Sequence, residues 1–168
     1  MMLARIVLIL LLTLFVASLL SQRVLAAEDD AKTLAADVAT LRHCLTGKRP
    51  LQQEGCIFII AKPCVGDETS KPPSEVEACH EREQRAWDLI LNDAYQLLHD
   101  KLDDDQAAKL RDMQRAWVAS RDRSCNFLYE FFQGNMANPM ISYCNNQETA
   151  RRAIYLDGFA DDVKSWKK

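Results

Sequence analysis

The chain has 168 residues, of which 48% are hydrophobic and 27% charged, and its formal net charge at pH 7 is −3. This length and composition are typical of a globular protein with a single domain. The acidic balance argues against nucleic acid and anionic membrane surfaces as partners, because both carry negative charge themselves.

Residues 1–26 have the pattern of a secretory signal peptide. Arg5 precedes an apolar run over residues 6–20, and the small residues Ala26 and Ala27 follow it. Charge, apolar core and small-residue cleavage site come in this order in signal peptides. An uncleaved anchor is the alternative, but the run is shorter than the roughly 20 apolar residues that span a bilayer. We therefore expect cleavage on export, which leaves no membrane span.

The cysteines agree with export. An even number of cysteines in an oxidising compartment predicts disulfides. The six are Cys44, Cys56, Cys64, Cys79, Cys125 and Cys144. A zinc site is the competing interpretation, but the chain has three histidines and no CxxC pair, so we expect neither a metal nor another cofactor.

The mature chain should begin with an extension over residues 27–73. Apolar periodicity predicts a helix over about 30–44, and a segment rich in Pro, Gly and Cys follows it. The short apolar run 57–61 does not distinguish a strand from a helical turn. A lone strand would have no partner, so we favour a short helix or a pinned loop.

Residues 74–168 predict an antiparallel helical hairpin with a further helix. The first helix should start at Ser74, where Ser74 and Glu77 fit a capping box, and end near Asp100. Aspartates form the turn, one of them capping a second helix over about 106–132. So short a connection makes the two helices antiparallel neighbours. With a last helix over about 146–164, the expected fold is an all-α, disulfide-stapled small bundle.

The hairpin geometry favours one disulfide. Cys125 lies near the end of the second hairpin helix and Cys144 just before the last helix, so a Cys125–Cys144 bridge would close the loop between them. The other cysteines would then staple the N-terminal extension, in one arrangement as Cys44–Cys56 and Cys64–Cys79. Spacing alone leaves the pairing open.

Polar residues share a face of the second hairpin helix with the core residue Trp117. Gln114, Trp117 and Arg121 recur at intervals of three and four residues. An arginine near the core must be paired. Glu83, one turn before Trp87 on the preceding helix, is at the matching height, and we predict a Glu83–Arg121 ion pair. We interpret it as a polar brace that sets helix register; the alternative is a ligand site within the bundle.

No catalytic constellation accompanies these residues. The sequence has no GxSxG motif around a serine and no glycine-rich phosphate loop. Cys79 and His80 resemble a thiol–imidazole pair, but we expect Cys79 to be in a disulfide. We therefore predict a binding or inhibitory protein and not an enzyme.

The order of motifs resembles the LprI-type lysozyme inhibitor family. The motifs are Cys-x3-Glu-x3-Trp, Leu-Asn-x2-Tyr, Gln-Arg-Ala-Trp, Arg-Asp-x2-Cys and Thr-x2-Arg. The residues that carry the resemblance are Cys79, Glu83, Trp87, Asn92, Tyr95, Gln114, Arg115, Trp117, Arg121, Asp122, Cys125, Cys144, Thr149 and Arg152. The resemblance covers roughly residues 79–156. It implies an exported helical hairpin domain, scaffold roles for these positions and, for some members, inhibition of lysozyme.

We expect a periplasmic or secreted protein that blocks a lysozyme-type muramidase by protein–protein contact. Loss of Arg5 and Arg23 with the signal peptide would lower the formal net charge from −3 to −5, which suits a cationic lysozyme. The candidate binding loop runs from Gln133 to Met140 at the disulfide-closed end. Its polar members are Gln133, Gly134, Asn135 and Asn138. The alternative function is a structural or envelope-stress protein that binds peptidoglycan or another envelope component.

Overall fold

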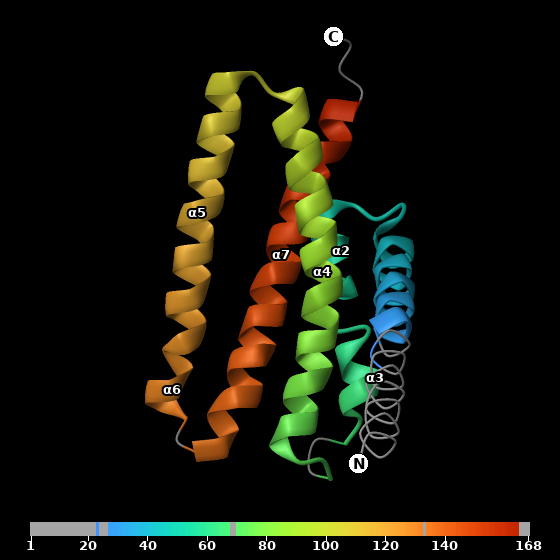
Figure 1. Cartoon of the computed structure of the whole chain (residues 1–168), viewed down its shortest axis with the longest axis vertical. Coiled ribbons are helices and arrows are strands. Elements are labelled where there is room, and N and C mark those ends of the chain that lie inside the picture. The colour runs from blue at the N-terminus through green and yellow to red at the C-terminus, as the bar shows by residue number, and fades with distance from the viewer. Residues whose placement is uncertain (1–22, 24–26, 68–69, 133, 165–168) are drawn as a thin grey trace, which may run out of the picture. The chain divides into compact units, whose positions relative to one another are not determined.

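The computed structural model describes residues 23, 27–67, 70–132 and 134–164 (Figure 1). The predicted signal peptide lies outside the described residues, except for Arg23. The chain divides into two compact units, residues 1–36 and 37–168. In the first unit, Lys32 Nζ forms a helical ion pair with Glu28 Oε1 at 2.8 Å.

The described residues form helices and turns, and no strand occurs among them. The elements after helical residues 27–45 are α2 (Pro50–Gln53), the 3-10 helix η1 (Glu54–Cys56), α3 (Ala61–Val65), α4 (Pro73–Lys101), α5 (Asp104–Asn126), α6 (Leu128–Phe131), the 3-10 helix η2 (Gly134–Met136) and α7 (Ala137–Lys164). The predicted all-α fold is therefore confirmed.

Helices α4 and α7 form the centre of the second unit. In Figure 1, α4 rises, α5 returns antiparallel to it, and α7 rises again alongside α4. The contact between α4 and α7 is the most extensive one between elements, and it buries Trp87, Ile90 and Leu156 completely. The antiparallel hairpin of α4 and α5 is present as predicted. Its two helices touch little, however, so α7 is the main partner of α4 and not α5.

The helix boundaries show what the sequence signals missed. Helix α4 begins at Pro73 with Pro72 as its N-cap, so the predicted capping box at Ser74 is wrong. A proline at the first position is already set for the helix and lacks the amide that a cap would satisfy. Asp103 does cap α5, accepting a hydrogen bond from the Gln106 amide at 2.8 Å.

Helix α7 begins at Ala137 and not near residue 146. Its first turn contains Pro139, which is tolerated there because the first amides of a helix have no intrahelical acceptor. The prediction of a loop through Met140 is therefore wrong, since only η2 and its flanking residues separate α6 from α7.

Three disulfides join Cys44 to Cys56, Cys64 to Cys79 and Cys125 to Cys144. The Cys125–Cys144 bridge is the one that the hairpin geometry favoured, and the other two follow the one arrangement that was named while their pairing was left open. None of the helices that the structure describes has the length and hydrophobicity that a bilayer crossing requires.

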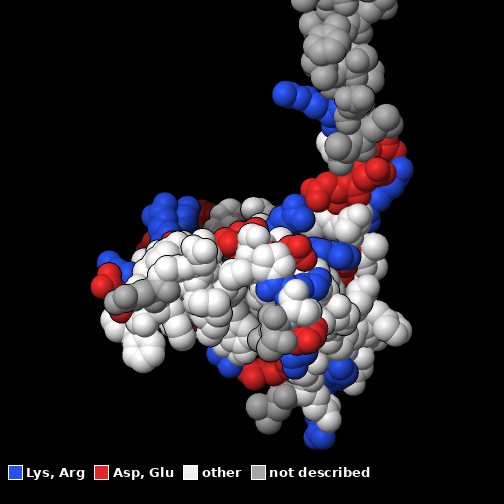
Figure 2. All heavy atoms as spheres, turned by 90° about the horizontal axis from the view of Figure 1, so that it is seen from below, with Lys and Arg blue, Asp and Glu red and all other residues white. Residues whose placement is uncertain are grey.

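Charged side chains are unevenly distributed on the end of the molecule that Figure 2 views from below. The side at which α6 lies is largely uncharged.

Candidate functional site

A fully buried carboxylate organises the packing around α4. Glu83 Oε1 accepts hydrogen bonds from the Phe58 amide at 2.6 Å and from Trp87 Nε1 at 3.0 Å. Its Oε2 accepts from the amides of Ile60 at 2.8 Å and Ala61 at 2.7 Å. Four donors thus replace the water that this 0% exposed side chain gave up. Glu83 therefore binds the Cys/Pro-rich extension to α4.

The backbone of the extension is shaped to this carboxylate. Phe58 has a φ of 73°, in the left-handed region that costs a residue with a side chain about 1 kcal/mol or more. Its ring stacks on that of Tyr143 in α7, with centroids 4.5 Å apart. The apolar run 57–61 is thus a turn that leads into α3 and is held by Glu83, which agrees with the pinned loop, one of the two predicted forms.

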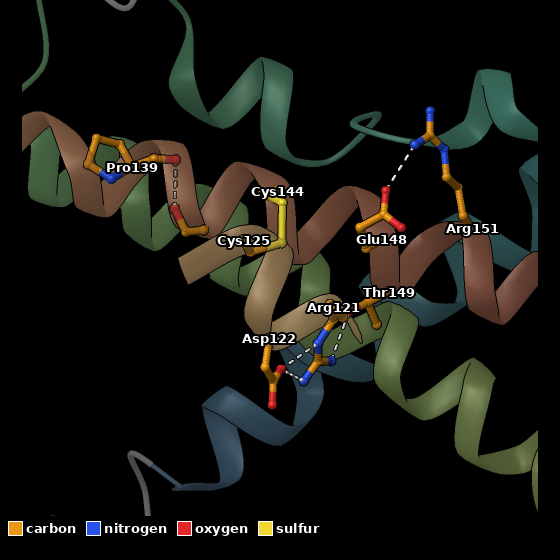
Figure 3. Close-up of a disulfide and its surroundings, with 9 residues drawn as sticks. Arg121, Asp122, Cys125, Pro139, Cys144, Glu148, Thr149 and Arg151 are labelled. Atoms are coloured by element: carbon orange, nitrogen blue, oxygen red, sulfur yellow. Dashed lines mark hydrogen bonds and ion pairs between the residues drawn. A yellow bond between two sulfur atoms is a disulfide. The ribbon is translucent and has the colours of Figure 1, made fainter. Parts of the chain in front are cut away.

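Arg121 has partners other than Glu83. Its Nε and Nη2 donate to Asp122 Oδ1 at 3.1 and 2.9 Å, and its Nη1 donates to Thr149 Oγ1 at 3.3 Å (Figure 3). The predicted Glu83–Arg121 ion pair is therefore wrong. Arg121 interacts electrostatically with a different carboxylate of α4, that of Asp88. Burial raises the pKa of Asp88, and the positive charge of Arg121 partly lowers it again.

Two guanidinium groups lie on the ring of Trp117. Arg121 is 5.0 Å and Arg152 is 5.5 Å from the ring centroid, and Arg152 Nε also donates to Gln114 Oε1. Burial lowers the pKa of Arg152, whose Nη2 is buried without a hydrogen-bond partner, so ring stacking compensates part of its desolvation. We call this set the α5–α7 clamp: Gln114, Trp117, Arg121, Asp122, Thr149 and Arg152.

The predicted motif residues thus separate into two groups. Cys79, Glu83 and Trp87 follow one another at four-residue intervals on α4 and hold the extension. The clamp holds α5 to α7. Asn92 and Arg115 are exposed, and Tyr95 is half-buried, so these three take part in neither group. The predicted polar brace exists, but it joins α5 to α7.

The segment that contains both groups of motif residues matches a known protein family. A family model described as lysozyme inhibitor LprI matches residues 64–156 of the chain. The chain belongs to the LprI lysozyme inhibitor family. The LprI match includes the Cys64–Cys79 disulfide and the whole clamp, whereas Cys44 and Cys56 lie outside it. A search of curated proteins found no match, and a search of solved structures found none either.

The Cys125–Cys144 disulfide closes one end of the LprI domain. It joins the last turn of α5 to the second turn of α7 over a sequence separation of 19 residues (Figure 3). Between these two cysteines, Ser142 Oγ donates a hydrogen bond to the Pro139 carbonyl oxygen at 3.0 Å, and Tyr129 Oη donates one to Asn138 Oδ1 at 2.9 Å. We call residues 125–144 the stapled end.

The predicted loop residues lie in this stapled end. Gly134 and Asn135 belong to η2, Asn138 is in the first turn of α7, and Gln133 lies outside the described residues. Gly134 has a φ of 72°, which favours glycine. The described polar residues thus lie in a 3-10 turn and at the start of a helix, and not in an extended loop.

Exposed apolar side chains distinguish the stapled end. They form what we call the apolar tip: Phe127, Tyr129, Phe131 and Met136, which are 62%, 55%, 75% and 55% exposed. Their exposure was not predicted, because the second hairpin helix was expected to continue to Phe132. The sequence does contain a signal for this exposure: one helix face cannot hold all four aromatic residues between positions 127 and 132, so some of them must face the solvent. Apolar groups gathered on a surface indicate an interaction site.

Proposed function

We propose that this LprI protein inhibits a lysozyme-type muramidase outside the cytoplasm and that the apolar tip makes the contact. The observation that carries the proposal is the exposed aromatic tip on a disulfide-closed end of a lysozyme inhibitor family member. Aromatic and methionine side chains are enriched at protein interfaces. A stapled end also loses little conformational entropy on binding, because the disulfide has already ordered it.

Charge assists this contact in a separate way. Cleavage of the predicted signal peptide would leave a formal net charge of −5, which attracts a cationic muramidase over several ångströms and raises the association rate. The tip itself is largely uncharged (Figure 2), so its contact is the less salt-sensitive part of binding. The three disulfides support an oxidising compartment such as the periplasm or the extracellular space.

The test is lysis of fluorescently labelled cell walls by lysozymes of several classes in the presence of the purified mature protein. We expect inhibition by the wild type and at least a roughly tenfold weaker inhibition constant for Phe127→Ser/Phe131→Ser, since central aromatic contacts contribute about 1–2 kcal/mol each. Undiminished lysis at micromolar wild-type protein would refute the function.

The chain offers a matched control for the tip. Tyr155 and Phe159 of α7 are a similarly exposed aromatic pair, at 48% and 46%, with ring centroids 4.9 Å apart. Tyr155→Ser/Phe159→Ser should inhibit as the wild type does. An equal loss in both double variants would show that the contact surface is elsewhere, even if inhibition itself is real.

A further inference from the structure

One disulfide has a cation at its sulfur atoms. Lys48 Nζ is 3.0 Å from Cys44 Sγ and 3.3 Å from Cys56 Sγ. Lys48 is exposed and follows the helix that ends at residue 45, whereas Cys56 is completely buried and Cys44 is half-buried. Cys44 is therefore the more accessible cysteine of this disulfide, and an ammonium group lies close to both sulfur atoms.

We propose that Cys44–Cys56 is a thiol-exchange site, at which an external thiolate attacks Cys44 and forms a mixed disulfide. The attacking sulfur bonds to Cys44 Sγ, the bond between the two cysteine sulfurs breaks, and Cys56 leaves as a thiolate. A second external thiol then releases Cys44 as a thiolate and carries away the oxidised pair. The co-reactant is a small thiol or a dithiol protein, and the oxidised product is its disulfide.

Lys48 favours this reaction at both sulfurs. A disulfide exchanges faster when the leaving thiol has a lower pKa, and a nearby lysine lowers a thiol's pKa by stabilising the thiolate. The ammonium group also attracts the incoming thiolate to Cys44. Because Lys48 is exposed, the attraction is screened by salt, so the acceleration should decrease as ionic strength rises.

The other two disulfides differ in the cation and not in burial. Each also joins a buried cysteine, Cys79 or Cys125, to a half-buried one, Cys64 or Cys144, but no cation donates to the sulfurs of either bridge among the residues that the structure describes. Lys71 lies near one of them, but its Nζ donates to the Cys64 carbonyl oxygen, at 2.6 Å, and not to sulfur. Lys71 is therefore a matched control for Lys48.

The test is partial reduction of the native, oxidised protein by glutathione, followed by acid quench, alkylation and peptide mapping. We expect Cys44 and Cys56 to be reduced first, with the glutathione adduct on Cys44. The variant Lys48→Gln should react roughly three- to tenfold more slowly at this bridge, Lys48→Arg should retain most of the rate, and Lys71→Gln should leave it unchanged.

Two results would overturn the proposal: first reduction at Cys64–Cys79 or Cys125–Cys144, or equal rates at Cys44–Cys56 for Lys48→Gln and the wild type. An adduct on Cys56 in place of Cys44 would contradict the direction of attack. A dithiol protein in place of glutathione should give the same order of reduction without a lasting adduct, which separates the two kinds of co-reactant.

Discussion

The two sides of the second unit are held together by different forces. Helices α4 and α7 pack through fully buried apolar side chains, and Glu83 fixes the extension to them through four buried hydrogen bonds. Helix α5 buries only Ala107, Leu110 and Cys125, and it is held by the polar clamp and one disulfide. The first arrangement stabilises the fold, and the second leaves apolar surface free for a partner.

An amphipathic sequence pattern does not show how deeply the apolar face of a helix is buried. Trp117 was expected to be a core residue of the second hairpin helix, yet it is half-buried, and Met113 and Val118 of the same helix are 37% and 39% exposed. The clamp replaces apolar packing with two guanidinium groups on one tryptophan. We therefore expect the α4–α7 side to determine global stability and the α5 side to determine local opening and binding.

The largest expected effect is at Glu83. Glu83→Ala would leave three backbone amides and the Trp87 indole without acceptors in the protein interior. We expect the free energy of unfolding to fall by about 3–5 kcal/mol, measured by urea denaturation without reductant. Glu81→Ala, at an exposed position of the same helix, should change it by less than about 0.5 kcal/mol. A similar result for both variants would contradict the role of the carboxylate.

A smaller and more local effect is expected at Trp117. Trp117→Ala removes the ring on which Arg121 and Arg152 lie, and we expect a loss of about 2 kcal/mol. Native-state hydrogen exchange should increase in the amides of α5 more than in those of α4. Val118→Ala is the control, because it shortens a neighbouring exposed side chain outside the clamp. Uniform acceleration across α4 and α5 would mean that the two sides unfold together.

The smallest effect concerns Asp88, which lies on α4 facing Arg121. Burial raises the pKa of Asp88 above its ordinary value of 3.8, so the folded state binds this proton more tightly than the unfolded state. The stability that Asp88 contributes is therefore present at low pH and is lost as the pH rises through its folded pKa. Asp88→Asn should be more stable than the wild type at neutral pH, by about 0.5 kcal/mol or less, because the group is partly solvated.

Urea midpoints from about pH 3 to pH 7 would check this dependence. The advantage of Asp88→Asn should disappear towards the acid end, where the wild-type carboxyl is also neutral. A variant that is less stable at neutral pH would mean that the attraction of Arg121 outweighs burial.

Much of the fold followed from the sequence. Periodicity gave the long helices, an even cysteine count gave disulfides, and the shortness of the Asp103 turn gave the antiparallel hairpin. The partners of Arg121 did not follow, because they are its chain neighbour Asp122 and Thr149 of α7, and helix spacing does not show whether the guanidinium turns towards α4 or α7. The Glu83 site depends on backbone amides of residues 58, 60 and 61, which every sequence possesses and no motif marks.

The proposed contact surface was predicted only in part. Its place beside the Cys125–Cys144 bridge followed from the expected geometry, but its chemistry did not. Gly, Asn and Pro suggested a polar loop, whereas Pro139 starts a helix and the exposed surface is aromatic. Turn-forming residues indicate a change of chain direction; they do not indicate which neighbouring side chains remain in water.

The ring closed by the Cys125–Cys144 bridge between α5 and α7 contains exposed residues as well as residues that pack on the scaffold. Substitutions at its exposed positions, such as Phe127 and Phe131, leave the residues around Glu83 in place, whereas Tyr143 also lies between the two cysteines and stacks on Phe58. The proposed contact surface can therefore vary at these exposed positions while the scaffold is kept. Under the proposed function, we expect a graft of another member's residues at these exposed positions to change target preference and leave the remaining helices intact.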